Sequence, residues 1–183
     1  MEADMWLKLN LEGMKIELQI SDYQQSNEEN WDDNWCNIDF SFVFQGCINY
    51  SGTSGVMLSY EVEELEKTIT GFIDGKFKER KTLQLVEPDF VFEFTPDNNR
   101  GHAEKTEYLT LEDEMSSTMM EWKVYLWNGG LTDHYFSITF YQDDLLVLRD
   151  YLQLVIGKLN KNSLKIKEYI DARIIYGGCS NYG

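Results

Sequence analysis

The sequence predicts an α+β protein with a predominantly antiparallel β-sheet, an open barrel or a strongly curved sheet, and two amphipathic helices packed against it. Three observations predict this class. Many segments alternate apolar and polar residues with the period of two that is typical of strands with one buried face. Two segments instead repeat apolar residues at helical spacing. The strands do not alternate one by one with helices, as the strands of a parallel sheet would.

The size and composition of the chain predict one well-packed domain. With 183 residues, 43% of them hydrophobic, the chain is long enough to bury a sizeable core. We expect a single globular domain over residues 1–159 and a basic, partly ordered C-terminal extension over residues 160–183. No apolar run approaches the length of a membrane span, and the N-terminus alternates where a signal peptide would be continuously apolar. These features predict a cytoplasmic protein.

The first element expected is a β-hairpin over residues 5–20. Two alternating runs flank Glu12-Gly13, a dipeptide suited to a two-residue turn. A hairpin with this turn places apolar residues opposite one another on one face and pairs Lys8 with Glu17 on the other. The predicted apolar pairs are Leu11 with Met14, Leu9 with Ile16, Leu7 with Leu18 and Met5 with Ile20.

The next element expected is a central strand over residues 35–45. Its alternate positions are apolar, and Asp39 falls between them, so Asp39 should face water. The inward set is Cys36, Ile38, Phe40, Phe42 and Phe44.

A turn region, a short strand and a helix should follow. Residues 46–55 are rich in glycine and serine and predict turns, and residues 56–59 predict a short strand. Apolar residues then recur at helical spacing, with Ser59 available near the N-cap and Asp74-Gly75 as the stop. This helix should bury its apolar stripe and expose Glu63 and Glu66. The stripe comprises Val62, Leu65, Ile69, Phe72 and Ile73.

The second half of the chain repeats the order of strands followed by a helix. Residues 82–94 and residues 104–141 contain alternating runs, and residues 145–159 show helical spacing after Asp143 and Asp144. The segment 163–176 is compatible with either a helix or a strand. The predicted strands are Leu83–Leu85, Phe90–Phe94, Glu104–Leu111, Met119–Trp127 and Tyr135–Tyr141.

The charge distribution is strongly uneven. The net charge is −16, and residues 16–66 contain 11 acidic residues but no lysine or arginine. The segment from Lys158 onward carries a local charge of +3. A field of this kind repels nucleic acid and anionic membranes and attracts cationic partners. We therefore expect a basic protein partner, and neither nucleic acid nor membrane.

The loop before the central strand, which we call the acidic loop, is the first candidate for a partner-binding site. It places carboxylates beside two tryptophans in a short segment, where a partner could meet both charge and aromatic area. A tryptophan at the start of a strand is also often a packing residue, and that alternative stays open. With the first helix included, the candidate residues are Glu28, Glu29, Trp31, Asp32, Asp33, Trp35, Glu63 and Glu66.

The sequence contains no catalytic, metal or cofactor motif. His102 and His134 lie near no nucleophile signature, and the three cysteines show no CxxC spacing. The acidic loop lacks the spacing of a calcium loop, and the glycines form no phosphate-binding pattern. We therefore predict no catalytic residue, no metal and no cofactor.

Four segments together resemble the bacterial WapI-type immunity proteins. They are the runs Leu7–Leu9 with Met14–Leu18, the motif Asp33–Ile38 of the form D-x-W-[LC]-N-I, the motif Leu58–Leu65, and Glu87–Phe94. The likeness covers about residues 5–159 and follows the order of the family. The loop over residues 112–117 and the basic tail depart from the pattern.

The resemblance implies a small bacterial cytosolic protein, encoded beside a polymorphic, contact-delivered toxin that it binds and neutralises. Such toxin domains are often RNases, and a basic RNA-binding domain would be complementary to an acidic surface. Two alternatives remain open at this point. One is a non-catalytic scaffold or stress protein that binds another basic partner, and the other is a hydrolase that uses paired carboxylates in the acidic loop.

Overall fold

The computed structural model describes residues 5–25, 34–97, 118–127 and 130–177. These residues divide into two compact units. Unit 1 comprises Met1–Glu64 and Leu148–Gly183, and unit 2 comprises Leu65–Val147, so the boundary falls within two helices. No helix of the described residues is long and apolar enough to cross a membrane.

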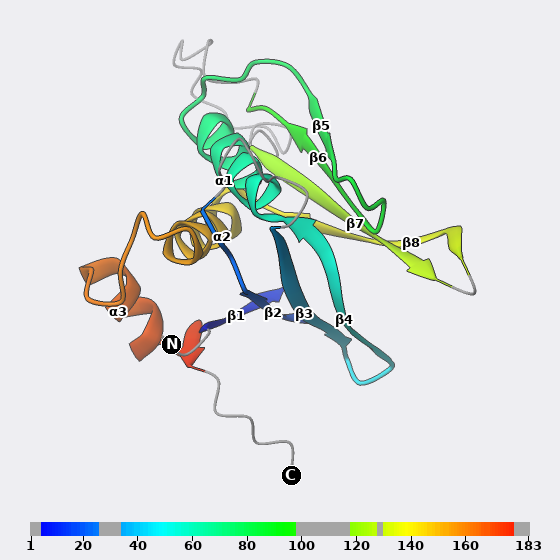
Figure 1. Cartoon of the computed structure of the whole chain (residues 1–183), viewed down its shortest axis with the longest axis horizontal. Coiled ribbons are helices and arrows are strands. Elements are labelled where there is room, and N and C mark those ends of the chain that lie inside the picture. Colours follow the sequence, from blue (N-terminus) through cyan, green and yellow to red (C-terminus); the bar gives the residue numbers. More distant parts are fainter. Residues whose placement is uncertain (1–4, 26–33, 98–117, 128–129, 178–183) are drawn as a thin grey trace, which may run out of the picture. The chain divides into compact units, whose positions relative to one another are not determined.

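Unit 1 contains a five-stranded antiparallel sheet, sheet A, whose strands follow the order β4-β3-β2-β1-β9 (Figure 1). The predicted central strand is β3, which lies between β2 and β4. Its residues Cys36, Ile38, Phe40 and Phe42 are buried as expected. The bounds are β1 Met5–Leu11, β2 Met14–Ser21, β3 Trp35–Phe44, β4 Ile48–Leu58 and β9 Ile175–Gly177.

The predicted hairpin is formed by β1 and β2. The register pairs Leu9 with Ile16, and the ion pair between Lys8 and Glu17 spans 3.5 Å. Glu12 and Gly13 both have positive φ, at 50° and 92°, as the tightest hairpin turns require. The register of this hairpin is therefore confirmed from Trp6–Gln19 to Leu11–Met14.

A tyrosine hydroxyl bridges β1 and β2 beyond the end of this ladder. The Ile20 N–H donates to the Tyr151 hydroxyl over 3.0 Å, and that hydroxyl donates to the Met5 carbonyl over 2.9 Å. Tyr151 lies on α2, Gln142–Val155, and is fully buried. The helix thus completes the polar pairing of two backbone groups that would otherwise be buried without partners.

The prediction of a turn region over residues 46–55 was wrong. β4 begins at Ile48, and the reversal is confined to residues 45–47, where Gln45 and Gly46 have positive φ. Gly52 lies opposite Phe40, and a Cβ atom at Gly52 would lie only 3.0 Å from Cζ of that ring. The glycine belongs to the strand because it leaves space for a cross-strand aromatic ring.

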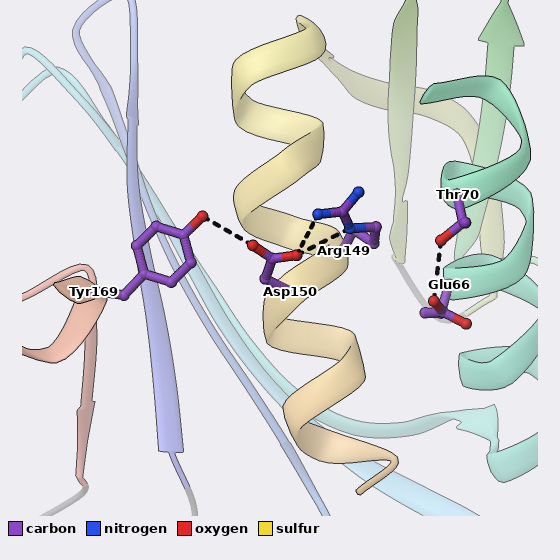
Figure 2. A network of polar contacts seen from close by, with 5 residues as sticks. All are labelled: Glu66, Thr70, Arg149, Asp150 and Tyr169. Carbon is purple, nitrogen blue, oxygen red and sulfur yellow. Dashed lines mark hydrogen bonds and ion pairs between the residues drawn. The ribbon is translucent and has the colours of Figure 1, made fainter. Parts of the chain in front are cut away.

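The C-terminal segment of unit 1 contains both of the structures that its sequence allows. α3, Leu164–Asp171, buries Ile166 and Tyr169, and β9 then pairs with β1 at the edge of sheet A. A buried polar cluster joins α3 to α2 (Figure 2). Tyr169 donates to Asp150 over 3.1 Å, and Arg149 donates to the same carboxylate over 2.6 and 2.9 Å.

Unit 2 contains a four-stranded antiparallel sheet, sheet B, in the order β5-β6-β7-β8. Helix α1 spans Ser59–Ile73. Its second half packs on one face of sheet B, where Phe72 stacks on Phe94 with ring centroids 5.1 Å apart. That face also buries Phe92, Trp122 and Ile138. The bounds are β5 Lys81–Gln84, β6 Phe90–Thr95, β7 Met119–Trp127 and β8 Leu131–Phe140.

The α+β class with mostly antiparallel strands is confirmed, and the details differ in three ways. The strands of the described residues form two sheets, neither of them closed into a barrel. Three helices are present among the described residues, where two were expected. The second predicted helix ends at Val155, four residues before its expected end. The predicted strand over residues 104–111 and the loop over residues 112–117 lie outside the described residues.

Candidate partner-binding site

The residues predicted to bind a partner are divided between described and undescribed parts of the chain. Trp35, Glu63 and Glu66 are described. The other predicted residues, Glu28, Glu29, Trp31, Asp32 and Asp33, lie outside the described residues. The structure does describe both ends of the segment that contains them, and these ends are in unit 1.

Ser59 holds the two ends of this segment. The Gln24 N–H donates to the Ser59 hydroxyl over 3.2 Å, and the Ser59 N–H donates to the Asn34 carbonyl over 2.8 Å. Ser59 is fully buried, and its Oγ lies 3.5 Å from the Cys36 sulfur. Gln24 and Asn34 lie on either side of the undescribed segment, so one residue holds both of its described ends.

Ser59 lies at the start of α1, near the N-cap as predicted, but its hydroxyl binds Gln24. The start of the helix is instead stabilised by Glu61, whose carboxylate accepts a hydrogen bond from the Leu58 N–H over 2.8 Å. This is the carboxylate half of a capping box, in which a glutamate at the third helical position reaches back to the N-cap backbone. The arrangement leaves the Ser59 hydroxyl available for the loop.

Glu63 lies beside the entry to the loop. The Tyr23 hydroxyl donates to its carboxylate over 2.7 Å. Burial, and then the hydrogen bond to Glu63, raise the pKa of the Tyr23 phenol above its ordinary value. The phenol thus stays protonated and continues to donate, so it ties the segment before the loop to the first turns of α1.

The exposed face of β3 carries the described part of the site. Trp35, Asn37 and Asp39 alternate with the buried residues of the strand, and Trp35 is 36% exposed. The Asn37 amide donates to Asp22 over 2.5 Å, and the Thr53 hydroxyl donates to Asp39. We call Asp22, Trp35 and Asp39 the loop-end surface.

The carboxylates of the loop-end surface are held by neutral donors. Within the described ranges, neither Asp22 nor Asp39 forms an ion pair with a lysine or arginine. Their charges are therefore available to a partner. Asp22 was missing from the predicted site. It directly follows Ser21, which pairs with Asn37 in the register of β2 and β3, and this register brings Asp22 to the start of β3.

Glu66 was predicted to be exposed, and this prediction was wrong. Its side chain is buried, with 2% of its surface exposed, and it accepts a hydrogen bond from Thr70 over 3.0 Å (Figure 2). Val62 and Ile69 lie one turn away on either side, so Glu66 falls within the apolar stripe of α1. A buried carboxylate cannot contribute to a surface that meets a partner.

The described residues offer neither an activated thiol beside Trp35 nor a cluster of metal ligands. Burial raises the pKa of the Cys36 thiol, and the nearby Asp22 and Glu61 carboxylates act in the same direction, which disfavours a reactive thiolate. No group of three or more His, Cys, Asp or Glu side chains in the described segments could hold a metal ion.

Comparison with known proteins identifies the family. No curated protein matches the chain. The model of the Immunity protein WapI-like family matches residues 7–160, which include most of β1, all of β2 to β8 and the loop-end surface. This match confirms the resemblance seen in the motifs at Asp33–Ile38 and Leu58–Leu65. The chain belongs to the WapI-like immunity protein family.

Proposed function

We propose that this chain neutralises a basic toxin domain, a nuclease, by binding it with the loop-end surface and the adjoining acidic loop. Family membership supports an immunity role and a toxin protein as the partner. The observation that carries the more specific proposal is that Asp22 and Asp39 point out from sheet A beside an exposed tryptophan, with no ion pair to a described cation.

A nuclease fits this surface because a domain that grips nucleic acid needs basic side chains for the phosphates. An acidic surface steers such a domain into encounter, and a tryptophan adds contact area that slows dissociation. Residues 16–66 contain no lysine or arginine, so the charges of the loop and of the loop-end surface act with the same sign. The family supports binding rather than catalysis.

The first experiment asks whether the chain protects against the toxin encoded by the neighbouring gene. Co-expression should restore growth of cells that produce the toxin domain. The rate of association should then be measured for purified proteins at two ionic strengths. We use an Asp22→Asn, Asp39→Asn double variant, because asparagine can accept the same hydrogen bonds from Asn37 and Thr53 but lacks the charge.

Removal of these two charges should slow association by roughly 3- to 10-fold at low salt and reduce its salt dependence. A Glu12→Gln, Glu79→Gln double variant is the matched control, because it removes the same charge from two exposed sites that belong to neither the loop nor the loop-end surface. Reversal of Glu28, Glu29, Asp32 and Asp33 to lysine tests the loop itself and should have a larger effect.

Unchanged association by both folded variants would remove this end of sheet A from the interface. A chain that neither binds the toxin domain nor protects cells would contradict the proposed function as a whole.

A further inference from the structure

The face of sheet B opposite α1 carries a group of aromatic and charged residues that the proposed site does not use. They alternate along β6, β7 and β8 with the buried residues that meet the helix. Tyr135 is 45% exposed, and Leu131 on the same strand is 43% exposed. We call this group the tyrosine face: Glu93, Glu121, Lys123, Tyr125 and Tyr135.

The tyrosine face is preorganised by its own contacts. The rings of Tyr125 and Tyr135 lie opposite each other in the register, with centroids 5.1 Å apart. Lys123 lies 5.4 Å from the Tyr135 ring centroid and forms a 2.5 Å ion pair with Glu93. Rigid aromatic side chains that lose little entropy on binding are enriched in the cores of protein interfaces.

The charges of this face are not balanced. Glu93 and Glu121 lie directly opposite each other on β6 and β7, an arrangement that destabilises an antiparallel pair. Lys123 forms its ion pair with Glu93 and also attracts Glu121, which has no direct ion pair or hydrogen bond within the described ranges, so two carboxylates face one ammonium group. A like-charge pair on an open sheet face costs stability, and such violations are expected where a function needs them.

We infer that the tyrosine face is a second docking surface, and that its occupant is a basic surface of the toxin domain. A lysine or arginine of that domain would pair with Glu121 and pack against the tyrosine rings, as cations do on aromatic faces. The charge argues against two other occupants. Nucleic acid would meet carboxylates, and a second copy of this chain would bring together two molecules of net charge −16.

This inference rests on the proposed function and is tested with the same toxin domain. Glu121→Gln removes the carboxylate that has no direct ion pair, and Tyr135→Thr removes the ring and keeps a residue suited to a strand. The matched controls are Glu79→Gln, at an exposed site in the same unit, and Tyr141→Thr, whose tyrosine is also 45% exposed. The measurements are the dissociation constant, its salt dependence and the denaturation midpoint.

Tyr135→Thr should raise the dissociation constant by about tenfold, as truncation of an aromatic anchor does. Glu121→Gln should raise it by about fivefold and reduce its salt dependence. The denaturation midpoint of Glu121→Gln should change little, because relief of the repulsion between Glu93 and Glu121 offsets the lost attraction between Glu121 and Lys123. This combination of weaker binding and undiminished stability is not expected of a residue with only a structural role.

The outcomes separate the two proposals. If the wild type binds the toxin domain and both variants bind it as tightly as their controls, the tyrosine face is not a docking surface and the proposed function stands. If the wild type does not bind the domain, the proposed function fails and the inference fails with it.

Discussion

Ser59 shows how a single side chain can serve several segments. Its backbone N–H and its hydroxyl hold residues on either side of the acidic loop, while its Oγ also lies next to the Cys36 sulfur. Ser59 is fully buried, and its bond to the Gln24 N–H is partly buried. One buried residue therefore holds Gln24 through its hydroxyl and Asn34 through its backbone N–H.

Ser59→Ala should lower the free energy of unfolding by about 1–2 kcal/mol, because the Gln24 N–H loses its acceptor in a partly buried position. The measurement is chemical denaturation, with Ser51→Ala on the exposed part of β4 as the control. A Ser59→Ala variant as stable as the control would show that the hydroxyl does not hold the loop. Slower toxin association by a folded Ser59→Ala variant that is less stable than the control would support a role of the hydroxyl in positioning Gln24.

Tyr169 provides a test of the polar cluster by pH. Burial, and then the adjacent Asp150 carboxylate, raise the pKa of its phenol above the ordinary value. In the unfolded chain the phenol ionises near its ordinary pKa of about 10, while in the folded chain it stays protonated. The stabilisation is thus fully present below about pH 10 and is lost as the pH rises further.

Tyr169→Phe should cost about 1–2 kcal/mol at about pH 8, because one hydrogen bond to a buried carboxylate is lost. The difference in free energy of unfolding between wild type and variant should shrink at about pH 11. At that pH, unfolding of the wild type releases the proton of this phenol, which favours the unfolded state. The free energies of unfolding of both proteins at the two pH values give the result, with exposed Tyr141→Phe as the control. A difference that grows with pH would contradict the assignment.

At the scale of the element, β4 shows how a strand can be built from residues that favour turns. It runs over 11 residues that include two glycines and several serines and threonines. Its partner β3 supplies large aromatic side chains, and Gly52 accommodates the Phe40 ring. The rings of Phe40, Phe42 and Tyr50 then cluster with centroids 5.4 to 6.4 Å apart. Packing across the strands thus outweighs the local preference of the sequence.

Gly52→Ala should destabilise the protein by about 1–3 kcal/mol, because the new methyl group would overlap the Phe40 ring. Gly55→Ala is the matched control in the same strand. Its nearest neighbour would be a carbonyl oxygen at 3.9 Å, so it should be neutral or stabilise the protein by about 0.5 kcal/mol. Denaturation midpoints decide the comparison, and equal effects of the two substitutions would argue against the close contact.

At the scale of the whole molecule, each unit has its own aromatic core. Phe40 is buried on sheet A, and Phe92 is buried on sheet B beside Trp122. The net charge of −16 opposes compaction of the chain, so these cores must supply much of the stability. The acidic surface proposed for binding therefore depends on two well-packed apolar faces.

Phe40→Ala and Phe92→Ala should each lower the free energy of unfolding by about 3–5 kcal/mol, through lost burial and the cavity that remains. Leu164→Ala is the control, because this leucine is 76% exposed and its truncation should change stability by less than about 0.5 kcal/mol. Denaturation midpoints of the phenylalanine variants within error of the wild type would mean that these faces are solvent-exposed.

The sequence by itself determined the features that depend on local periodicity and turn chemistry. The register of the first hairpin follows from its alternation and from the dipeptide Glu12-Gly13, and the inward residues of β3 follow from the period of two. The buried stripe of α1 follows from helical spacing. The four motifs, taken in their order along the chain, also sufficed to indicate the family, which the match over residues 7–160 confirms.

Only the tertiary structure decided the features that depend on contacts between distant residues. Glu66 is buried and Ser59 binds the ends of a loop, although both residue types favour exposed or capping positions. The division of the strands into two sheets and the pairing of β9 with β1 join segments far apart in the chain. A single sequence records the preference of each segment but not which segments will meet, because that choice depends on the burial of all of them together.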